Sequence, residues 1–282
     1  IGTDTCPSYG ETLNVVGDVV VELDPETGEA VQEISMFDSL DPCRRMDRDF
    51  DHPFWNATYG GITTQDWTHG NAVFYDETRG IIVTSLRHAD WVVAFDYVPG
   101  EPSMSGDVAW ILGDEGTEGD YDGHPSFMPT GTPLEWQYHQ HAPMYTADGN
   151  LLIYDNGNLR PGTDFDPDDA DGDADLPYSR AVEYSLDTSD PDPANWTIEQ
   201  SWEHTVDDGM GGLLYAPFVG DADELENGNV LVTHGGILEP AAPRGLRFSI
   251  RNTRGEMDDS EDDSALSHSG LRPTSPLRAR SI

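Results

Sequence analysis

Five polar residues stand where apolar segments of the chain begin or end: His69, His141, Asn156, Arg180 and His234. A neutral imidazole can act as a nucleophile and can also move protons. Guanidinium and amide groups donate hydrogen bonds to the oxygens of an anion, and a guanidinium is a planar fork that fits a tetrahedral oxyanion. These residue types therefore suit the transfer of an anionic group, provided that the fold brings them together.

The segments that carry these residues are predicted to be short β-strands joined by tight turns. A hairpin over 18–36 is followed by three units, at 66–113, 140–203 and 213–236, each with a first strand, a glycine-containing turn and a second strand that ends in polar residues. Repeated antiparallel meanders are typical of an all-β β-propeller with four-stranded blades. A propeller gathers such strand ends around one central funnel.

Three well-formed units and one partial unit are too few to close a propeller, which needs at least about four blades. We therefore expect that some blades are missing from this sequence, or that it holds more units than the pattern reveals. Residues 1–243 are predicted to form the propeller domain. Residues 244–282 contain half of the arginines, and we expect them to be an irregular or disordered tail.

The composition is strongly acidic, with 54 acidic residues, 14 basic residues and a net charge of -40. All of the basic residues are arginines, and the chain has no lysine. This pattern is typical of an extreme halophile, because molar salt shortens the Debye length to about 3 Å and screens self-repulsion. We expect folding to need high salt and exclude nucleic acid as a partner. No apolar run approaches the ~20 residues of a membrane span.

No metal or cofactor site is predicted. The acidic segment 164–175 resembles a calcium loop in composition, but it lacks the terminal glutamate, and we interpret it as a solvated insert. The sequence shows no zinc-ligand spacing and no phosphate-cradling loop, so we expect activity to survive chelation. Cys6 and Cys43 lie far apart, and a disulfide or two separate thiols are equally compatible with that spacing.

Together, several short motifs resemble the arylsulfate sulfotransferase family over about residues 18–236. They occur in the family's order and rough spacing: Phe37-Asp38-Ser39-Leu40-Asp41-Pro42, Asp66-Trp67-Thr68-His69-Gly70-Asn71, Gln140-His141-Ala142-Pro143, Tyr154-Asp155-Asn156-Gly157 with Arg160, Tyr178-Ser179-Arg180-Ala181-Val182-Glu183-Tyr184 and Gln200-Ser201-Trp202-Glu203. No single motif is specific, but their succession is.

The resemblance implies a six-bladed propeller that moves a sulfuryl group from a phenolic sulfate ester to a phenolic acceptor. It also implies that a histidine carries the group, that no nucleotide donor is needed, and that both partners are small molecules. An extracytoplasmic location is implied too, although this sequence shows no signal peptide. The oligomeric state stays open.

The resemblance also suggests roles for individual residues. We expect His234, which precedes a glycine pair, to attack sulfur, although a purely structural histidine fits this position equally well. Arg180, Asn156, His69 and His141 would hold the sulfuryl oxygens and assist proton movement. The aromatic side chains expected to pack on the aryl ring are Trp67, Tyr154 and Tyr215.

Three other histidines, His88, His139 and His204, are expected to lie outside the site. Two alternative functions remain. The chain could be a catalytically inactive propeller used as a binding or scaffold module, or an aryl sulfate ester hydrolase in which water is the acceptor. Turnover of a phenyl sulfate with and without added phenol separates the three functions.

Overall fold

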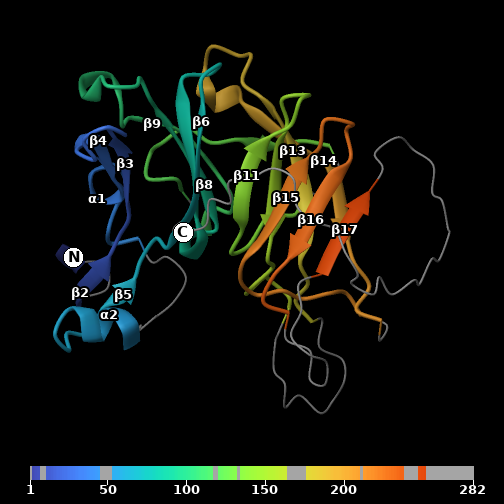
Figure 1. Ribbon diagram of the computed structural model, residues 1–282, viewed down its shortest axis with the longest axis horizontal. Coiled ribbons are helices and arrows are strands. Elements are labelled where there is room, and N and C mark those ends of the chain that lie inside the picture. The colour runs from blue at the N-terminus through green and yellow to red at the C-terminus, as the bar shows by residue number, and fades with distance from the viewer. Residues whose placement is uncertain are drawn as a thin grey trace.

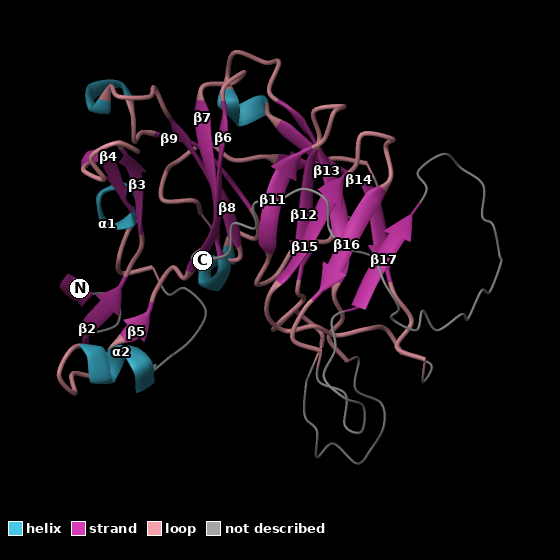
Figure 2. Cartoon of the chain, in the orientation of Figure 1, coloured by secondary structure: helices cyan, strands magenta, loops and turns pink. Residues whose placement is uncertain are grey.

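The computed structural model describes residues 2–6, 11–44, 53–116, 120–131, 134–163, 176–209, 212–237 and 247–251. Within these ranges most regular structure is β-strand, and the helices are short (Figure 2). The sheets stand side by side, and the described residues do not close them into a ring (Figure 1). The all-β prediction is confirmed, whereas the closed propeller implied by the resemblance is not seen in this part of the chain.

One complete four-stranded blade lies at the centre of the molecule. Its strands follow one another in sequence order: β6 (Gly70–Asp76), β7 (Ile81–Leu86), β8 (Trp91–Asp96) and β9 (Val108–Leu112). All pairs are antiparallel, as predicted for this unit. Two short 3₁₀ helices, η1 (Arg87–Ala89) and η2 (Pro102–Met104), connect β7 to β8 and β8 to β9.

The next sheet has the order β10-β14-β13-β12-β11. Its main strands are β11 (His141–Tyr145), β12 (Leu151–Asp155), β13 (Arg180–Asp187) and β14 (Thr197–Thr205), and β10 (Met128–Pro129) pairs in parallel with the outer edge of β14. The 3₁₀ helix η4 (Pro193–Asn195) precedes β14. These are the strands predicted for the third unit, while the acidic segment 164–175 lies outside the described residues.

The last sheet corrects the sequence prediction. Residues 213–219, expected to be a strand, are irregular apart from a bridge at Leu213, and the first strand of the unit is β15 (Gly220–Glu224). Its sequence, Gly-Asp-Ala-Asp-Glu, is polar, and its middle residue Ala222 is buried. It pairs with β16 (Val230–His234), and β16 pairs with β17 (Arg247–Arg251), which falls inside the range expected to be an irregular tail.

The N-terminal part forms two smaller sheets. The predicted hairpin consists of β3 (Val19–Leu23) and β4 (Ala30–Ser35) and leads into helix α1 (Met36–Ser39). A second sheet has the order β1-β2-β5, from β1 (Gly2–Cys6), β2 (Glu11–Val16) and β5 (Gln65–Asp66), and helix α2 (Pro53–Thr58) precedes β5. Cys43 is disulfide-bonded, and the chain has one other cysteine, Cys6.

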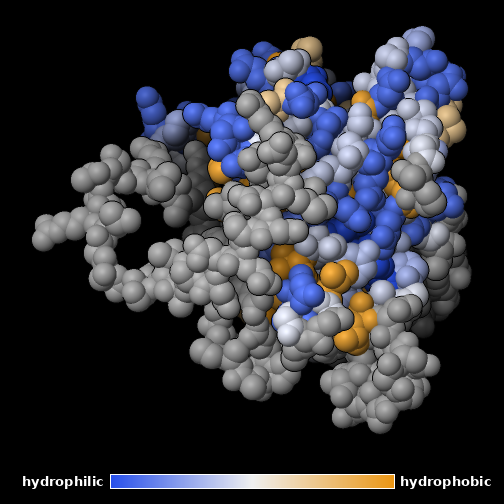
Figure 3. Space-filling view, turned by 90° about the vertical axis from the view of Figure 1, so that its right-hand side faces the viewer, coloured by the Kyte–Doolittle hydropathy of each residue, from blue (hydrophilic) through white to orange (hydrophobic). Residues whose placement is uncertain are grey.

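The hydrophobic core consists of layers between neighbouring sheets. Because side chains alternate along a strand, each strand serves two layers. In β12, Leu151 and Ile153 pack towards the central blade, whereas Leu152 and Tyr154 pack towards β15 and β16. The described surface on the right-hand side of Figure 1 is mainly hydrophilic (Figure 3). Among the described helices, none is long and apolar enough to cross a membrane.

Candidate functional site

The inner strands of the three large sheets begin at the same end of the molecule. The first residues of β6, β11 and β15 pair with the ends of the second strands, as Gly70 with Leu86, His141 with Tyr154 and Gly220 with His234. Strand β11 adjoins both β6 and β15. The loops at this end therefore converge, and we call the polar group that they form the mouth: Asp66, His69, Arg87, His88, His141, Asn156 and Tyr215.

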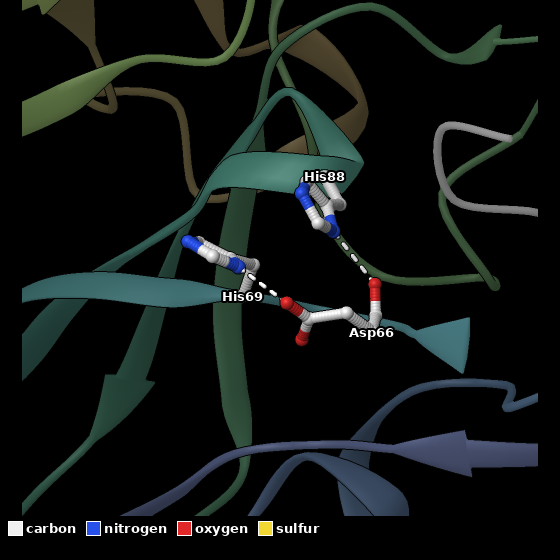
Figure 4. Close-up of side chains that lie close together, drawn as sticks. All are labelled: Asp66, His69 and His88. Atoms are coloured by element: carbon white, nitrogen blue, oxygen red, sulfur yellow. Dashed lines mark hydrogen bonds and ion pairs between the residues drawn. The ribbon is translucent and has the colours of Figure 1, made fainter. Parts of the chain in front are cut away.

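His69 and Asp66 form a charge-oriented pair at the mouth (Figure 4). His69 Nδ1 lies 2.6 Å from Asp66 Oδ2, and the His69 side chain is 41% exposed while that of Asp66 is 6% exposed. Burial raises the pKa of Asp66, but the hydrogen bond and the charges of His69 and His88 outweigh it and hold the pKa below its ordinary value. An ionised carboxylate on Nδ1–H leaves Nε2 as the lone-pair nitrogen, which is the arrangement of an activated imidazole.

The backbone of His69 is held in an unusual conformation. Its φ is 51°, in the left-handed region that non-glycine residues rarely adopt. Asp18 fixes both neighbours, because Asp18 Oδ2 accepts from Thr68 Oγ1 at 2.5 Å and from Gly70 N at 2.6 Å. The carbonyl of His69 accepts from Arg87 N at 3.2 Å. Such contacts maintain backbone strain of the kind that gathers at functional sites.

His141 is oriented by Asn156. His141 Nδ1 lies 2.6 Å from Asn156 Oδ1, and Asn156 Nδ2 donates to the carbonyls of Ala216 at 2.7 Å and Val219 at 3.0 Å. These carbonyls fix which end of the amide faces the imidazole, so Nδ1 carries the proton. Burial, followed by the nearby positive charge of Arg87, lowers the pKa of His141 to about 4. His141 is therefore a neutral imidazole at neutral pH.

Two mouth residues, Arg87 and His88, were missed by the sequence prediction. The charge of Arg87 acts on His88, His141 and Tyr215, and its Nη2 donates to Pro217 O at 3.2 Å. We expected His88 to lie outside the site, but it is buried, its Nδ1 lies 2.6 Å from the Asp66 carbonyl, and its ring centroid is 4.5 Å from that of His69.

A signal for both residues was present in the sequence. Arg87 and His88 directly follow the apolar strand β7, just as Asn156 directly follows β12. His139 is likewise buried rather than peripheral, with its ring centroid 5.8 Å from that of His88 and its Nδ1 3.1 Å from Asp90 Oδ1.

His234 and Tyr154 lie between two sheets rather than in the open mouth. His234 Nδ1 lies 2.9 Å from the Tyr154 hydroxyl, and both side chains are fully buried. The Tyr154 ring lies against Gly220, where a Cβ would come within 2.2 Å of the ring. This position differs from our expectations that His234 attacks a bound ester and that Tyr154 packs on its aryl ring, because substrate cannot reach sealed side chains without movement.

Arg180 also differs from its expected place. Its guanidinium is fully buried, with Nε 2.8 Å from Asp155 Oδ2, Nη1 2.7 Å from Glu203 Oε2 and Nη2 2.7 Å from the Glu135 carbonyl. Burial lowers the pKa of Arg180, but the charge of Asp155 outweighs it and raises the pKa above its ordinary value. A sulfuryl group would have to displace these acceptors, so the geometry favours a structural role.

Of the aromatic residues expected to contact substrate, only Tyr215 is at the mouth. It is half-buried beside Arg87, and burial raises its pKa. Trp67 is a core residue instead: it is buried, stacks on Phe37 with centroids 5.3 Å apart, and donates from Nε1 to the Arg44 carbonyl at 3.3 Å. Tyr215 thus remains the candidate for contact with an aryl ring.

One group among the described residues has the composition of a metal site, although the sequence predicted none. Asp66, His69 and His88 each offer a ligand atom, and these atoms lie within 4.8 Å of one another. Figure 4 shows the two imidazoles side by side above the carboxylate. The group can therefore act as a nucleophilic histidine oriented by a carboxylate, or as a set of ligands for a metal ion.

Comparison with known proteins places this sequence in a family. A sequence model of the arylsulfotransferase (ASST) family matches residues 3–263. The chain is also similar to "Arylsulfate sulfotransferase AssT" of Escherichia coli, with 25% identity over 208 residues, which cover 67% of this chain and 30% of that protein. The chain thus spans less than a third of this relative. Because the family match extends over most of the sequence, the chain belongs to the arylsulfotransferase family.

Proposed function

We propose that this protein moves a sulfuryl group from an aryl sulfate ester to a phenolic acceptor, and that His69 carries the group between them. The observation that carries the proposal is the exposed His69 imidazole held by the Asp66 carboxylate, beside the positive charge of Arg87. Family membership supports sulfuryl transfer in general. The choice of His69 rests on the geometry of the mouth.

In the first half-reaction, His69 Nε2 attacks sulfur, the bond between sulfur and the aryl oxygen breaks, and phenolate leaves. The ring gains positive charge as the N–S bond forms, and Asp66 stabilises it through Nδ1–H, as the acid of a Ser-His-Asp triad does. In the second half-reaction, a phenol oxygen attacks sulfur and the N–S bond breaks. His141, which is neutral at neutral pH, would accept the phenol proton.

Arg87 takes the part that we expected of Arg180. Negative charge spreads over the sulfuryl oxygens during transfer, and a fixed donor at such a site is worth about 3 kcal/mol. The charge of Arg87 acts on both His141 and Tyr215. Arg180, in contrast, directs its donors to Asp155, Glu203 and the Glu135 carbonyl.

His234 is the alternative carrier of the sulfuryl group. We favour His69 over His234 on access, since the His69 side chain is 41% exposed and that of His234 is fully buried. The two histidines also differ in the group that faces their Nδ1 atoms. Asp66 supplies a full negative charge to stabilise a sulfated imidazolium at His69, whereas His234 faces the neutral hydroxyl of Tyr154.

The test is labelling by donor alone. With p-nitrophenyl sulfate and no acceptor, the protein should release one equivalent of p-nitrophenol in a burst and gain the mass of one sulfuryl group. His69→Ala should abolish burst and mass gain together, and His234→Ala should retain both. If His234→Ala loses the burst and the mass gain while His69→Ala retains both, His234 is the carrier.

The acceptor separates the remaining functions. Phenol-stimulated turnover supports transfer, and turnover that is independent of phenol supports an ester hydrolase. If neither the wild type nor any variant releases phenol in molar KCl, the chain acts as a scaffold and the proposed function is wrong.

A further inference from the structure

The geometry points to a binding site for a divalent transition-metal ion of the zinc class at Asp66, His69 and His88, where the ion would block rather than assist transfer. These residues come from three neighbouring pieces of chain. Asp66 ends β5, His69 precedes β6 and His88 lies in η1 (Figure 4). Asp66 and His69 are three residues apart in the sequence, and the fold brings His88 to this pair.

The separation of the ligand atoms fits a small ion. One ligand atom from each residue lies within 4.8 Å of the other two. Ions of this class bind nitrogen and oxygen at about 2.0–2.2 Å, which places tetrahedral ligands about 3.3 Å apart. Small side-chain rotations can therefore close the set around an ion. The exposed face of His69 gives the ion a route in and leaves a position for water.

The surrounding contacts resemble those of known metal centres. His88 is held by the hydrogen bond between its Nδ1 and the Asp66 carbonyl, at 2.6 Å. The Asp66 carboxylate accepts a further hydrogen bond from the side chain of Trp55, which α2 brings to the site. Outer contacts of this kind orient metal ligands and contribute to affinity.

The donor types select the class of ion. Two imidazoles and one carboxylate suit zinc and its neighbours, whereas calcium and magnesium need oxygen ligands in larger number. The net charge of -40 also concentrates cations around the molecule.

Metal binding would change the state of His69. An ion between Asp66 and His69 Nδ1 replaces their hydrogen bond, and the Nδ1 proton moves to Nε2, so that the ring stays neutral and no proton is released. A protonated Nε2 has no lone pair with which to attack sulfur. This consequence rests on the proposed function, whereas the site itself does not.

Direct binding provides the test. Titration calorimetry with ZnCl₂ in metal-free molar KCl should detect one tight site in the wild-type chain, above weak binding to surface carboxylates. His88→Ala and Asp66→Asn should weaken the tight site at least about 100-fold, because each removes a ligand. His204→Ala, a histidine deletion on β14, should bind zinc like the wild type. Equal zinc binding by all four proteins would overturn the proposal.

A second variant and a second measurement decide the test if His88→Ala does not fold. If circular dichroism shows that His88→Ala is misfolded, His69→Ala decides, because its side chain is 41% exposed and its loss leaves the core intact. Retention of the tight site in folded His69→Ala would also refute the proposal. Zinc should in addition suppress the phenol burst of the wild type. If the wild type binds zinc tightly but shows no burst with donor alone, the metal site is supported and only the proposed transfer activity is wrong.

Discussion

Two regions that meet at the end of β12 use polar residues in opposite ways. Asp155 ends the strand and points into a sealed network, where Oδ2 binds Arg180 Nε at 2.8 Å and Arg160 Nη2 at 2.7 Å. The next residue, Asn156, points into the mouth and holds His141. Adjacent residues project to opposite sides of an extended chain, so one strand end contributes to both regions.

The difference lies in which charges face one another. In the arginine network, oppositely charged groups face one another, and Asp155 Oδ1 also accepts from Tyr138 N and Gly157 N, both at 2.9 Å. In the mouth, the positive charge of Arg87 opposes protonation of His141. Opposite charges that face one another stabilise a fold, whereas a positive charge beside neutral imidazoles at a partly exposed site is suited to bind an anion.

The largest predicted effect concerns the network. Arg180→Ala leaves the buried carboxylate of Asp155 with one arginine instead of two, and we expect the free energy of unfolding to fall by about 3–5 kcal/mol. Urea unfolding in molar KCl measures this loss.

Arg79→Ala is the matched control, because the pair of Arg79 with Asp76 is at the surface and the Arg79 side chain is 42% exposed. It should lose no more than about 1 kcal/mol. If Arg180→Ala is as stable as Arg79→Ala but transfers sulfuryl groups about 100-fold more slowly, Arg180 is an anion ligand and our comparison of the two regions fails.

The sequence was sufficient to predict the strands that follow a clear hydrophobic pattern. Both β7 and β12 open with a run of apolar residues that follows a turn, and both were predicted. It was insufficient for β15, because Gly-Asp-Ala-Asp-Glu has the composition of a loop and becomes a strand through pairing with β16. Closure into a ring depends on contacts between sheets, which a strand pattern does not encode.

For the site, the sequence identified the polar residues that stand at strand ends. It did not show whether a substrate could reach each of these side chains. His69, His141 and Asn156 lie at strand ends that meet in the folded chain, and their roles stay predictions. Arg180 was chosen for its residue type, its place at a strand end and its motif, which resembles that of the family. Its burial was not visible in the sequence, because it depends on Asp155, Glu135 and Glu203, which meet only in the folded chain.

The second prediction concerns protonation of His141. The pKa of His141 is lowered to about 4 in the folded protein, from an ordinary value near 6.5. Between these values the unfolded chain binds more protons than the folded one, so stability is lost as pH falls from 6.5 towards 4. The loss from this group alone amounts to about 3 kcal/mol.

Comparison of the wild type with His141→Gln isolates this contribution, because acid also protonates carboxylates in both proteins. Urea unfolding at a series of pH values should give a shallower decline between pH 6.5 and 4 for the variant. Parallel curves would show that His141 is as easily protonated in the folded chain as in the unfolded one.

The third prediction tests the positive charge at the mouth. Arg87→Ala should lower kcat/KM for an aryl sulfate about 100-fold, which corresponds to one strong contact with the developing anion. The fall should appear in both half-reactions, seen as a slower burst and as slower transfer to phenol. Arg87→Lys should recover part of the rate, because it restores the charge without the planar fork. An unchanged rate in Arg87→Ala would remove Arg87 from the proposed mechanism.

The smallest predicted effect is at Tyr215, the one candidate aryl contact that lies at the mouth. A single pair of aromatic rings is worth about 0.5–1.5 kcal/mol, so Tyr215→Ala should raise KM for an aryl sulfate by about two- to twelve-fold with little change in kcat. Tyr215→Phe keeps the ring and should retain the wild-type KM. Tyr154→Phe removes only the hydroxyl that faces His234, and with His69 as the carrier it should leave the burst intact. A lost burst in Tyr154→Phe, together with an unchanged KM in Tyr215→Ala, would move the reaction from the open mouth to the buried pair of His234 and Tyr154.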